Sequence, residues 1–501
     1  MSTIAVVNGI DLSATASRPL AGGSSALQRS LAAAARLPGA PRVVLLASGP
    51  LEPGPDVRVV RRDAWTSAAL LEALAEAATG IDDIFYYFAD FALLDPGLAT
   101  RMYEDHRRFF AEYTFADGYP AGLAPEILRT DAVARLRSLA AGFPDLLAKS
   151  PGRDTLFSIV QKDINSFDVE TVLARRDQRL LRASLTADGE RNAMLVEALL
   201  ARGVDDAEAA ASALEADPRV LRTLPAFFNV QVVAACPQSC AYCPYPATVG
   251  DPRALADAMP VERFATLLDE IQRFAHDAHV GISLWGEPSL HPAIEDLVAA
   301  ATARPGIRLV VETSGVGWRP GALASIASVP AARAVTWIVS LDAATAGVYA
   351  GLRGDGFAEA SATAGELLRS FPDTTYVQAV RMKENEEDLE AFYREWKRRT
   401  EHVIIQKYDP FCGVVADRKV ADLSPLSRFP CWHLRRDVTI LLDGTVPLCR
   451  EDLRAGAALG NAFTDGLEAI WERGGRQYAR HVQGDLPDLC GRCDEYYTFN
   501  F

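Results

Sequence analysis

Three closely spaced cysteines are the residues of this chain best suited to chemistry. They are Cys236, Cys240 and Cys243, in the string Cys-Pro-Gln-Ser-Cys-Ala-Tyr-Cys. A [4Fe–4S] cluster held entirely by protein takes four cysteine thiolates, so three thiolates leave one iron open for another ligand. A structural zinc ion usually takes four ligands, often from C-x2-C pairs. The C-x3-C-x2-C spacing therefore favours an open cluster over zinc.

The composition narrows the class of protein. The chain has 501 residues, of which 49% are hydrophobic, and a formal net charge of −15. At roughly 100–200 residues per domain, two to four domains are expected. The acidic balance argues against a nucleic-acid partner, which usually requires a basic surface. The sequence shows no signal-peptide pattern and no apolar run near the roughly 20 residues that span a bilayer. We therefore expect a cytoplasmic protein with no membrane partner.

The pattern of apolar runs predicts an α/β protein with four segments. Residues 1–185 alternate short apolar strands with helices, which predicts a mainly parallel, Rossmann-like sheet. Residues 186–225, rich in Ala, Leu, Glu and Asp, are predicted to be a helical linker. Residues 226–410 repeat a strand and a helix-length segment. Residues 411–501 are rich in cysteine and contain a predicted hairpin over 440–448, with Asp443-Gly444 at its turn.

The third segment is predicted to be a partial (β/α)6 barrel. Its six candidate strands are residues 228–234, 280–285, 308–312, 336–341, 376–381 and 402–407. A complete barrel of this type has eight strand–helix units, and its chemistry collects on the loops that follow the strands. The three cysteines follow the first strand, where a catalytic loop is expected.

These features resemble the radical S-adenosylmethionine (SAM) superfamily. The resemblance implies that the three cysteines hold a [4Fe–4S] cluster and that SAM occupies its open iron. It also implies that SAM is cleaved reductively to methionine and a 5′-deoxyadenosyl radical, which abstracts hydrogen from a substrate. A flavodoxin or ferredoxin is the expected electron donor.

Further motifs along the barrel fit the same family. Trp285-Gly286-Glu287-Pro288 resembles its Gly-Gly-Glu-Pro motif, and residues 312–315 resemble its Glu-Thr-Asn-Gly motif. The resemblance implies that SAM contacts lie among ten residues. These residues are Tyr242, Gly286, Glu287, Pro288, Glu312, Ser314, Ser340, Asp342, Arg353 and Arg381. Within this set, Arg353 is expected to pair with the SAM carboxylate and Arg381 to lie near the adenine.

The last segment carries a second group of cysteines. Cys431 and Cys449 are followed by a C-x2-C pair, Cys490 and Cys493. Four cysteines can close a [4Fe–4S] cluster, but they can equally hold zinc. The spacing resembles the SPASM and twitch extensions of radical SAM enzymes. Because no further cysteine follows Cys493, the resemblance implies the twitch form with one auxiliary [4Fe–4S] cluster. Cys412 is left over, either as a buried apolar thiol or near the active site.

The first segment has no complete phosphate-binding motif. It resembles the nucleotidyltransferases, in which Asp90 and Asp163 would be candidates to hold magnesium. The first lysine in the chain is Lys149, whereas active members carry basic residues in the first loop. Nucleotidyl transfer is therefore expected to be lost, and a role in binding remains open.

Over its full length the chain resembles the spiro-SPASM proteins. We expect a radical SAM enzyme that oxidises or cross-links a C–H bond of a peptide, polyol or sugar. Lys407, Tyr408 and Asp409 leave the last barrel strand and are the candidate catalytic residues. The alternative is a nucleotidyltransferase-like enzyme with a zinc- or cluster-bearing scaffold that does not turn over SAM.

Overall fold

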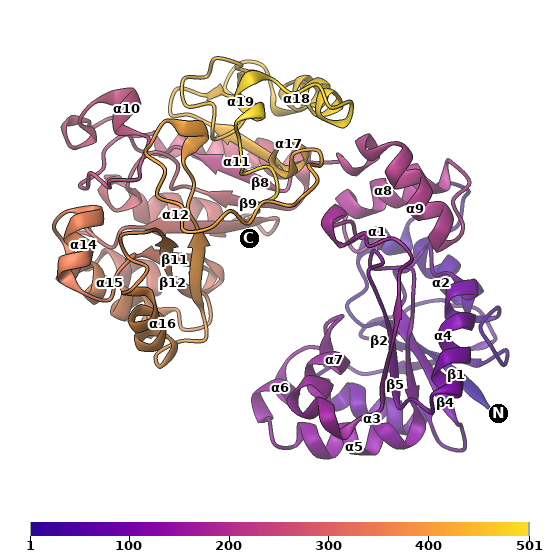
Figure 1. The fold of residues 1–501 in the computed structure, drawn as a ribbon. Coiled ribbons are helices and arrows are strands. Elements are labelled where there is room, and N and C mark those ends of the chain that lie inside the picture. Colours follow the sequence, from indigo (N-terminus) through magenta and orange to yellow (C-terminus); the bar gives the residue numbers. More distant parts are fainter. Residues whose placement is uncertain (1, 499–501) are drawn as a thin grey trace. The chain divides into compact units, whose positions relative to one another are not determined.

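The computed structural model describes residues 2–498. It divides into two compact units, Met1–Thr223 and Leu224–Phe501 (Figure 1). Each unit contains one seven-stranded sheet. None of the helices within residues 2–498 has the length and apolar character needed to cross a membrane.

The first unit is built on a mixed sheet with helices on both faces. Its strands are β1 Thr3–Gly9, β2 Arg42–Ala47, β3 Val57–Arg61, β4 Asp83–Phe88, β5 Tyr113–Asp117, β6 Glu126–Arg129 and β7 Val169–Leu173. The order is β3-β2-β1-β4-β6-β5-β7, and β6 pairs antiparallel with both of its neighbours. Consecutive side chains of β1 are buried in different cores, Val6 in one and Val7 in the other. This arrangement explains the unbroken apolar run of β1, since a sheet covered on both faces has no polar side.

The helices of this unit include two that were predicted as a linker. The first seven are α1 Ala14–Ser17, α2 Ala26–Ala34, α3 Ser67–Ala77, α4 Pro96–Arg108, α5 Thr130–Ala140, α6 Pro144–Ala148 and α7 Thr155–Val160. Residues 186–225 contain α8 Glu190–Leu200 and α9 Ala207–Ala216. Val196 and Leu214 of these helices share a buried core with Val7 of β1. The segment is helical as predicted, but its apolar faces complete the first unit and do not form a separate linker.

The second unit contains the predicted barrel strands. They are β8 Phe227–Val230, β9 Ala278–Gly281, β10 Ile307–Thr313, β11 Thr336–Ser340, β12 Thr375–Arg381 and β13 Val403–Lys407. The helices are α10 Pro246–Val249, α11 Val261–Ala275, α12 Ile294–Thr302, α13 Ala322–Ala327, α14 Ala346–Arg353, α15 Phe357–Ser370 and α16 Leu389–Lys397. All strand pairs in this sheet are parallel. Their carboxyl ends therefore lie at one edge, where the loops meet.

A seventh strand, β14 Asp437–Ile440, leads into the predicted hairpin over 440–448, in which Leu441 N–H donates to the Thr445 carbonyl at 2.8 Å. It pairs parallel with β8, and Val438 and Ile440 are buried in the barrel core. The turn at Asp443-Gly444 is present, since Gly444 N–H donates to the Leu441 carbonyl at 2.9 Å. After that turn, β15 Thr445–Val446 pairs with β16 Gly460–Asn461. Pairing with β8 at the edge of the large sheet thus buries the apolar side chains of β14 in the barrel core.

The last part of the chain packs onto the barrel through a long helix. Its helices are α17 Trp432–Arg436, α18 Leu467–Val482 and α19 Asp488–Gly491. Leu467 and Ile470 of α18 are buried in the barrel core. Tyr478, further along the same helix, packs with Cys431 and Cys490 in a small separate core. The helix therefore connects the barrel to the second group of cysteines.

Candidate active site and cysteine clusters

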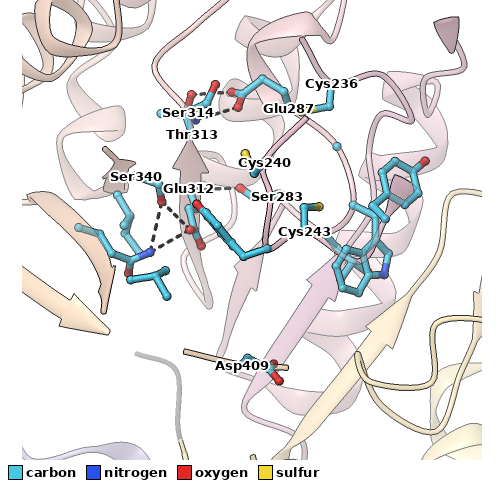
Figure 2. A pocket seen from close by; sticks show the side chains of 18 of the residues that line it. Cys236, Cys240, Cys243, Ser283, Glu287, Glu312, Thr313, Ser314, Ser340 and Asp409 are labelled. Atoms are coloured by element: carbon cyan, nitrogen blue, oxygen red, sulfur yellow. Dashed lines mark hydrogen bonds between the residues drawn. The ribbon is translucent and has the colours of Figure 1, made fainter. Parts of the chain in front are cut away.

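A cavity of about 530 Å³ lies where the loops of the parallel strands meet. It is within the range of roughly 300–1,000 Å³ found for small-molecule sites. Cys236, Cys240 and Cys243 line it together with Glu312 and Asp409. Figure 2 shows the thiols gathered around one part of the space, with Asp409 at a distance from them on the other side. One cavity thus contains the thiols and a candidate acid–base group.

The three thiols of this cavity are free and partly buried. Burial raises the pKa of Cys236 to about 12 and that of Cys243 to about 11, and the charge of neighbouring thiolates adds to both effects. Each thiol is therefore close enough to influence the others. A metal must displace their protons to bind them.

The cysteine loop is fixed by hydrogen bonds to α14. Gln238 accepts from Arg353 Nε at 3.1 Å and donates to the Tyr349 hydroxyl at 2.7 Å. Ala241 N–H donates to the Leu352 carbonyl at 2.8 Å. The side chain of Gln238 thus holds the cysteine loop in place against α14. The three cysteines of that loop line the cavity.

The Gly286-Glu287-Pro288 segment connects neighbouring strand ends. A Cβ atom on Gly286 would lie 2.0 Å from the Val233 carbonyl oxygen, so only glycine fits there. Glu287 is buried, and its carboxylate accepts from the Thr313 hydroxyl at 2.5 Å and from Ser314 N–H at 2.8 Å. The glutamate therefore ties the loop after β9 to the end of β10. Pro288 begins a short 3-10 helix and does not line the cavity.

A polar cluster lines the cavity across three neighbouring strands. Glu312 Oε1 accepts from the Ser340 hydroxyl at 2.7 Å and from Gln378 Nε2 at 3.0 Å (Figure 2). Gln378 was not predicted from the sequence. The signal for it was a polar side chain inside the otherwise apolar strand β12, at a position where an apolar residue is expected.

The second group of cysteines surrounds a smaller cavity. Cys431, Cys449, Cys490 and Cys493 all line it. Burial raises the pKa of each thiol except Cys493, whose pKa is lowered mainly by a hydrogen bond from Cys412. Cys412 is buried and borders this group, which agrees with the buried-thiol alternative.

Sulfur separations discriminate between a cluster and zinc. Among residues 2–498, no three cysteine sulfurs lie within 4.8 Å of one another. A tetrahedral zinc ion with bonds of about 2.3 Å would bring its sulfur ligands to about 3.8 Å from one another. Neither group of cysteines therefore places three sulfurs at the mutual distances expected for the ligands of one zinc ion.

Comparison with known proteins agrees with this geometry. The family described as the radical SAM superfamily matches residues 230–395, and the SPASM iron–sulfur cluster-binding domain matches residues 431–494. The chain belongs to the radical SAM superfamily. The two matches imply two iron–sulfur clusters and SAM as cofactors. An uncharacterized protein of Treponema pallidum (strain Nichols) is 40% identical over 360 residues, which cover 69% of this chain and 98% of that protein.

Solved structures resemble parts of the chain at low identity. BtrN in complex with AdoMet and 2-DOIA is 17% identical, with a TM-score of 0.39, and the match covers 54% of this chain and 94% of BtrN. SuiB of Streptococcus suis bound to the precursor peptide SuiA is 15% identical, with a TM-score of 0.41 and coverages of 70% and 85%. A cytidylyltransferase of Leptospira borgpetersenii is 15% identical, with a TM-score of 0.38 and coverages of 44% and 96%.

Seven of the ten predicted SAM contacts line the cavity of this radical SAM chain, and Pro288, Asp342 and Arg381 do not. Asp342 is fully buried and does not line the cavity. Arg353 lines the cavity, but its guanidinium donates to Asp342 at 2.6 Å and to the Tyr242 hydroxyl at 2.5 Å. The contact between Asp342 and SAM therefore stays a prediction, and in this structure the partner of Asp342 is Arg353. The pair instead supports the wall on which Tyr242 lies.

Arg381 is also placed outside the cavity. Its side chain is 41% exposed and pairs with Glu386, with Nε 2.8 Å from the carboxylate. The strand β12 alternates its side chains between two faces. Gln378 and Val380 line the cavity, whereas Arg381 follows on the other face. The prediction that Arg381 contacts the adenine is therefore not supported by this position.

The Asp342–Arg353 pair gives a testable prediction for stability. Asp342→Asn removes the charge that compensates a buried guanidinium, and breaking such a pair typically costs about 3–5 kcal/mol. Asparagine tolerates the positive φ of 64° at this position, so the charge is the main change. We expect a clearly lower urea midpoint, followed through the cluster absorbance. Asp251→Asn, which removes the exposed partner of Arg253, serves as control and should leave the midpoint unchanged. Equal midpoints for the two variants would contradict this role.

The three candidate catalytic residues all line the cavity, but they have different partners. The Tyr408 side chain is buried, and its hydroxyl donates to the Ala416 carbonyl at 2.5 Å. The Lys407 ammonium is paired with Glu495. Asp409 accepts from Arg450 Nη2 at 2.8 Å and from Phe411 N–H at 2.8 Å. Burial raises the pKa of Asp409 despite the opposing charge of Arg450. Asp409 is thus the best placed of the three to exchange a proton.

Arg450 is a site residue that the sequence did not reveal. It follows Cys449 directly and lines both the large cavity and the cysteine cavity. Its guanidinium bonds to Asp409 and to Glu451 at 3.0 Å. No sequence motif predicts this position for Arg450, because its contact with Asp409 forms only when the segment after β15 packs against the loop after β13.

In the first unit, the candidate magnesium ligands are already occupied. Asp90 is buried and paired with Arg153, whose Nη2 lies 2.6 Å from Asp90 and 3.0 Å from Asp188. The guanidinium stands where a cation between these carboxylates would bind. Asp163 accepts from the Ser166 hydroxyl at 2.5 Å and is exposed. These residues do not fit a magnesium site.

Proposed function

We propose that this protein binds SAM in the large cavity, cleaves it reductively, and oxidises or cross-links a C–H bond of a peptide, polyol or sugar. Cys236, Cys240 and Cys243 would hold the cluster that SAM completes. When bound, the cluster and SAM supply an electron and a 5′-deoxyadenosyl radical. The chain's own residues position SAM and substrate and receive the proton.

One observation carries this proposal. A single cavity joins the three thiols, the Glu312–Ser340–Gln378 cluster and the buried carboxylate of Asp409. A cluster with an open iron therefore has, within one cavity, polar groups for a cofactor and an acid–base group for a substrate. No other arrangement described above combines the three.

The cavity walls suggest a place for each part of SAM. The backbone around Gly286 lies beside the thiols and would meet the amino acid part of SAM. Glu312 and Ser340 present oxygen atoms that hydroxyl groups of a ribose can reach as hydrogen-bond partners. Tyr242 has its ring 6.0 Å from the Arg353 guanidinium, which holds the ring in place beside the cavity.

Asp409 and Arg450 support a net two-electron oxidation. After hydrogen abstraction, the substrate carbon must lose one proton and one electron to become an oxidised product. Asp409 can take the proton, because a buried carboxylate with a raised pKa holds a proton more readily than an exposed one. Arg450 lines both cavities, so the substrate end of the cavity and the auxiliary cysteines share a wall. The electron would pass to a closed auxiliary cluster held by Cys431, Cys449, Cys490 and Cys493.

Anaerobic turnover with SAM tests the proposal. The reconstituted protein should contain iron and sulfide for two clusters and, with dithionite as reductant, release 5′-deoxyadenosine and methionine. A synthetic cysteine- or glycine-rich peptide and a set of free polyols then serve as probes of substrate class. The correct class should raise the rate above that with SAM alone. Protein that contains zinc without sulfide, or that releases no 5′-deoxyadenosine, would contradict the proposal.

The alternative function receives less support. A nucleotidyltransferase on a zinc scaffold would need a cation site in the first unit and closely spaced cysteines in the second. Arg153 lies between Asp90 and Asp188, and among residues 2–498 no three cysteine sulfurs lie within 4.8 Å of one another. We therefore propose a binding role for the first unit, without metal-dependent transfer.

A further inference from the structure

The auxiliary cysteine cavity contains a histidine without a partner. His481 lies in the last turn of α18 and lines the cavity with the four cysteines. Its side chain is buried, with 5% of the residue exposed. Neither ring nitrogen has a hydrogen-bond partner among residues 2–498. A buried polar group without a partner typically costs about 1–3 kcal/mol, so an unfilled partner position at this cavity needs an explanation.

A second histidine at the same cavity shows the contrast. His433 Nδ1 lies 2.6 Å from the Asp437 carboxylate, and its Nε2 lies 3.1 Å from the Thr498 hydroxyl. Both of its nitrogens are therefore satisfied within the protein. The described part of the chain thus provides hydrogen-bond partners for His433 and none for His481. Since nearly all buried polar groups are hydrogen-bonded in native proteins, we expect the partner of His481 to be a group that residues 2–498 do not supply.

The helix orients His481 toward the cysteines. Tyr478 lies three residues earlier, and residues three apart share one face of a helix. Tyr478 packs in the same small core as Cys431 and Cys490. The face of α18 that carries Tyr478 and His481 is therefore the face that meets the second group of cysteines. The lining of the cavity by His481 agrees with this direction.

Two arginines, Arg428 and Arg450, also line this cavity, and the bonds recorded for both go to oxygen atoms. Arg450 donates to Asp409 and Glu451. Arg428 donates to the backbone carbonyls of Cys490 at 2.7 Å and of Cys493 at 3.2 Å. These bonds fix the C-x2-C loop, and they direct two N–H donors of Arg428 to carbonyl oxygens. Imidazole keeps at least one N–H in either of its protonation states at neutral pH. His481 therefore offers a donor that no described oxygen or nitrogen accepts.

We propose that His481 donates its ring N–H to a sulfur atom of the auxiliary iron–sulfur cluster and stabilises the reduced form of that cluster. This rests on the auxiliary cluster of the proposed function. Hydrogen bonds to cluster sulfurs are among the factors that set reduction potential. A donor placed there makes the cluster a better acceptor for the electron that leaves the substrate. His481 is thus a positioning residue for electron transfer and does not contact the substrate.

Two variants test the proposal in a background that keeps only the auxiliary cluster. With Cys236, Cys240 and Cys243 replaced by alanine, His481→Leu removes the donor, whereas His481→Gln retains an N–H donor. Each protein should keep about four irons per chain. An EPR-monitored redox titration should give a lower midpoint potential for His481→Leu, with His481→Gln closer to the parent protein.

Other results would overturn the proposal. Equal potentials in all three proteins, or an equal shift in both variants, would exclude a hydrogen bond from His481. Loss of iron in both variants would make His481 a cluster ligand instead. ENDOR of the reduced cluster in the unaltered chain needs no variant, and it should detect a coupled proton that exchanges in D2O. Its absence would also contradict the proposal. None of these readouts requires SAM cleavage. Failure of the hydrogen-bond proposal can therefore be told apart from failure of the proposed SAM cleavage.

Discussion

Replacing Cys236, Cys240 and Cys243 together by alanine is expected to abolish formation of 5′-deoxyadenosine and to remove about half of the bound iron. The three thiols line one cavity and are the candidate ligands of the open cluster. The auxiliary cysteines lie around a different cavity and should retain about four irons. Iron and sulfide analysis, with chromatography of the SAM products, measures both effects on the same sample.

Cys412→Ala provides the matched control for this variant. Cys412 is a buried cysteine outside both proposed ligand sets, although its thiol contacts Cys493. The control should keep the iron of both clusters and continue to cleave SAM. Residual 5′-deoxyadenosine in the triple variant would contradict the assignment of the open cluster. Loss of all iron from the triple variant would contradict two independent clusters.

Asp409→Asn is expected to separate SAM cleavage from product formation. Asparagine has nearly the same shape and can still accept a hydrogen bond from Arg450, but it cannot take the proton from the oxidised substrate. Positioned acid–base groups contribute roughly 10²–10⁴-fold to rate. Formation of the oxidised product should therefore fall by about that factor, while 5′-deoxyadenosine is still released. Both products are quantified by mass spectrometry once the substrate class is known.

Asp417→Asn is the control for the loss of a carboxylate. Asp417 is exposed on the same loop and does not line the cavity. Its variant should match the unaltered chain in both products. If Asp409→Asn retained full product formation, Asp409 would not be the base. If it lost SAM cleavage as well, its role would be structural, through the contact with Arg450.

Local sequence patterns were sufficient to predict most of the second unit. The six barrel strands are short apolar runs, and the cysteine spacings are carried by a few adjacent residues. The glutamate of Gly286-Glu287-Pro288 was predicted as a SAM contact. In the structure it lines the cavity and bonds to the end of β10, and its contact with SAM stays a prediction. The motif did not reveal that this glutamate also connects two strand ends.

Features that depend on distant contacts were missed. Arg450 and Gln378 reach the cavity only because separate strands bring their loops together. The buried pair of Asp342 with Arg353 was also not predicted. The strand β14 paired with β8, more than two hundred residues away, and not within a hairpin. These features depend on contacts between segments far apart in the sequence, which local patterns do not specify.

The central claim is that three cysteines leave one iron open for SAM while four cysteines close the second cluster. Mössbauer spectroscopy of protein reconstituted with ⁵⁷Fe, with and without SAM, tests it directly. Of about eight irons, one should change its isomer shift when SAM is added, about one-eighth of the signal. The change should vanish in the Cys236, Cys240 and Cys243 variant. A spectrum that SAM leaves unaltered, or a change that persists in that variant, would contradict the claim.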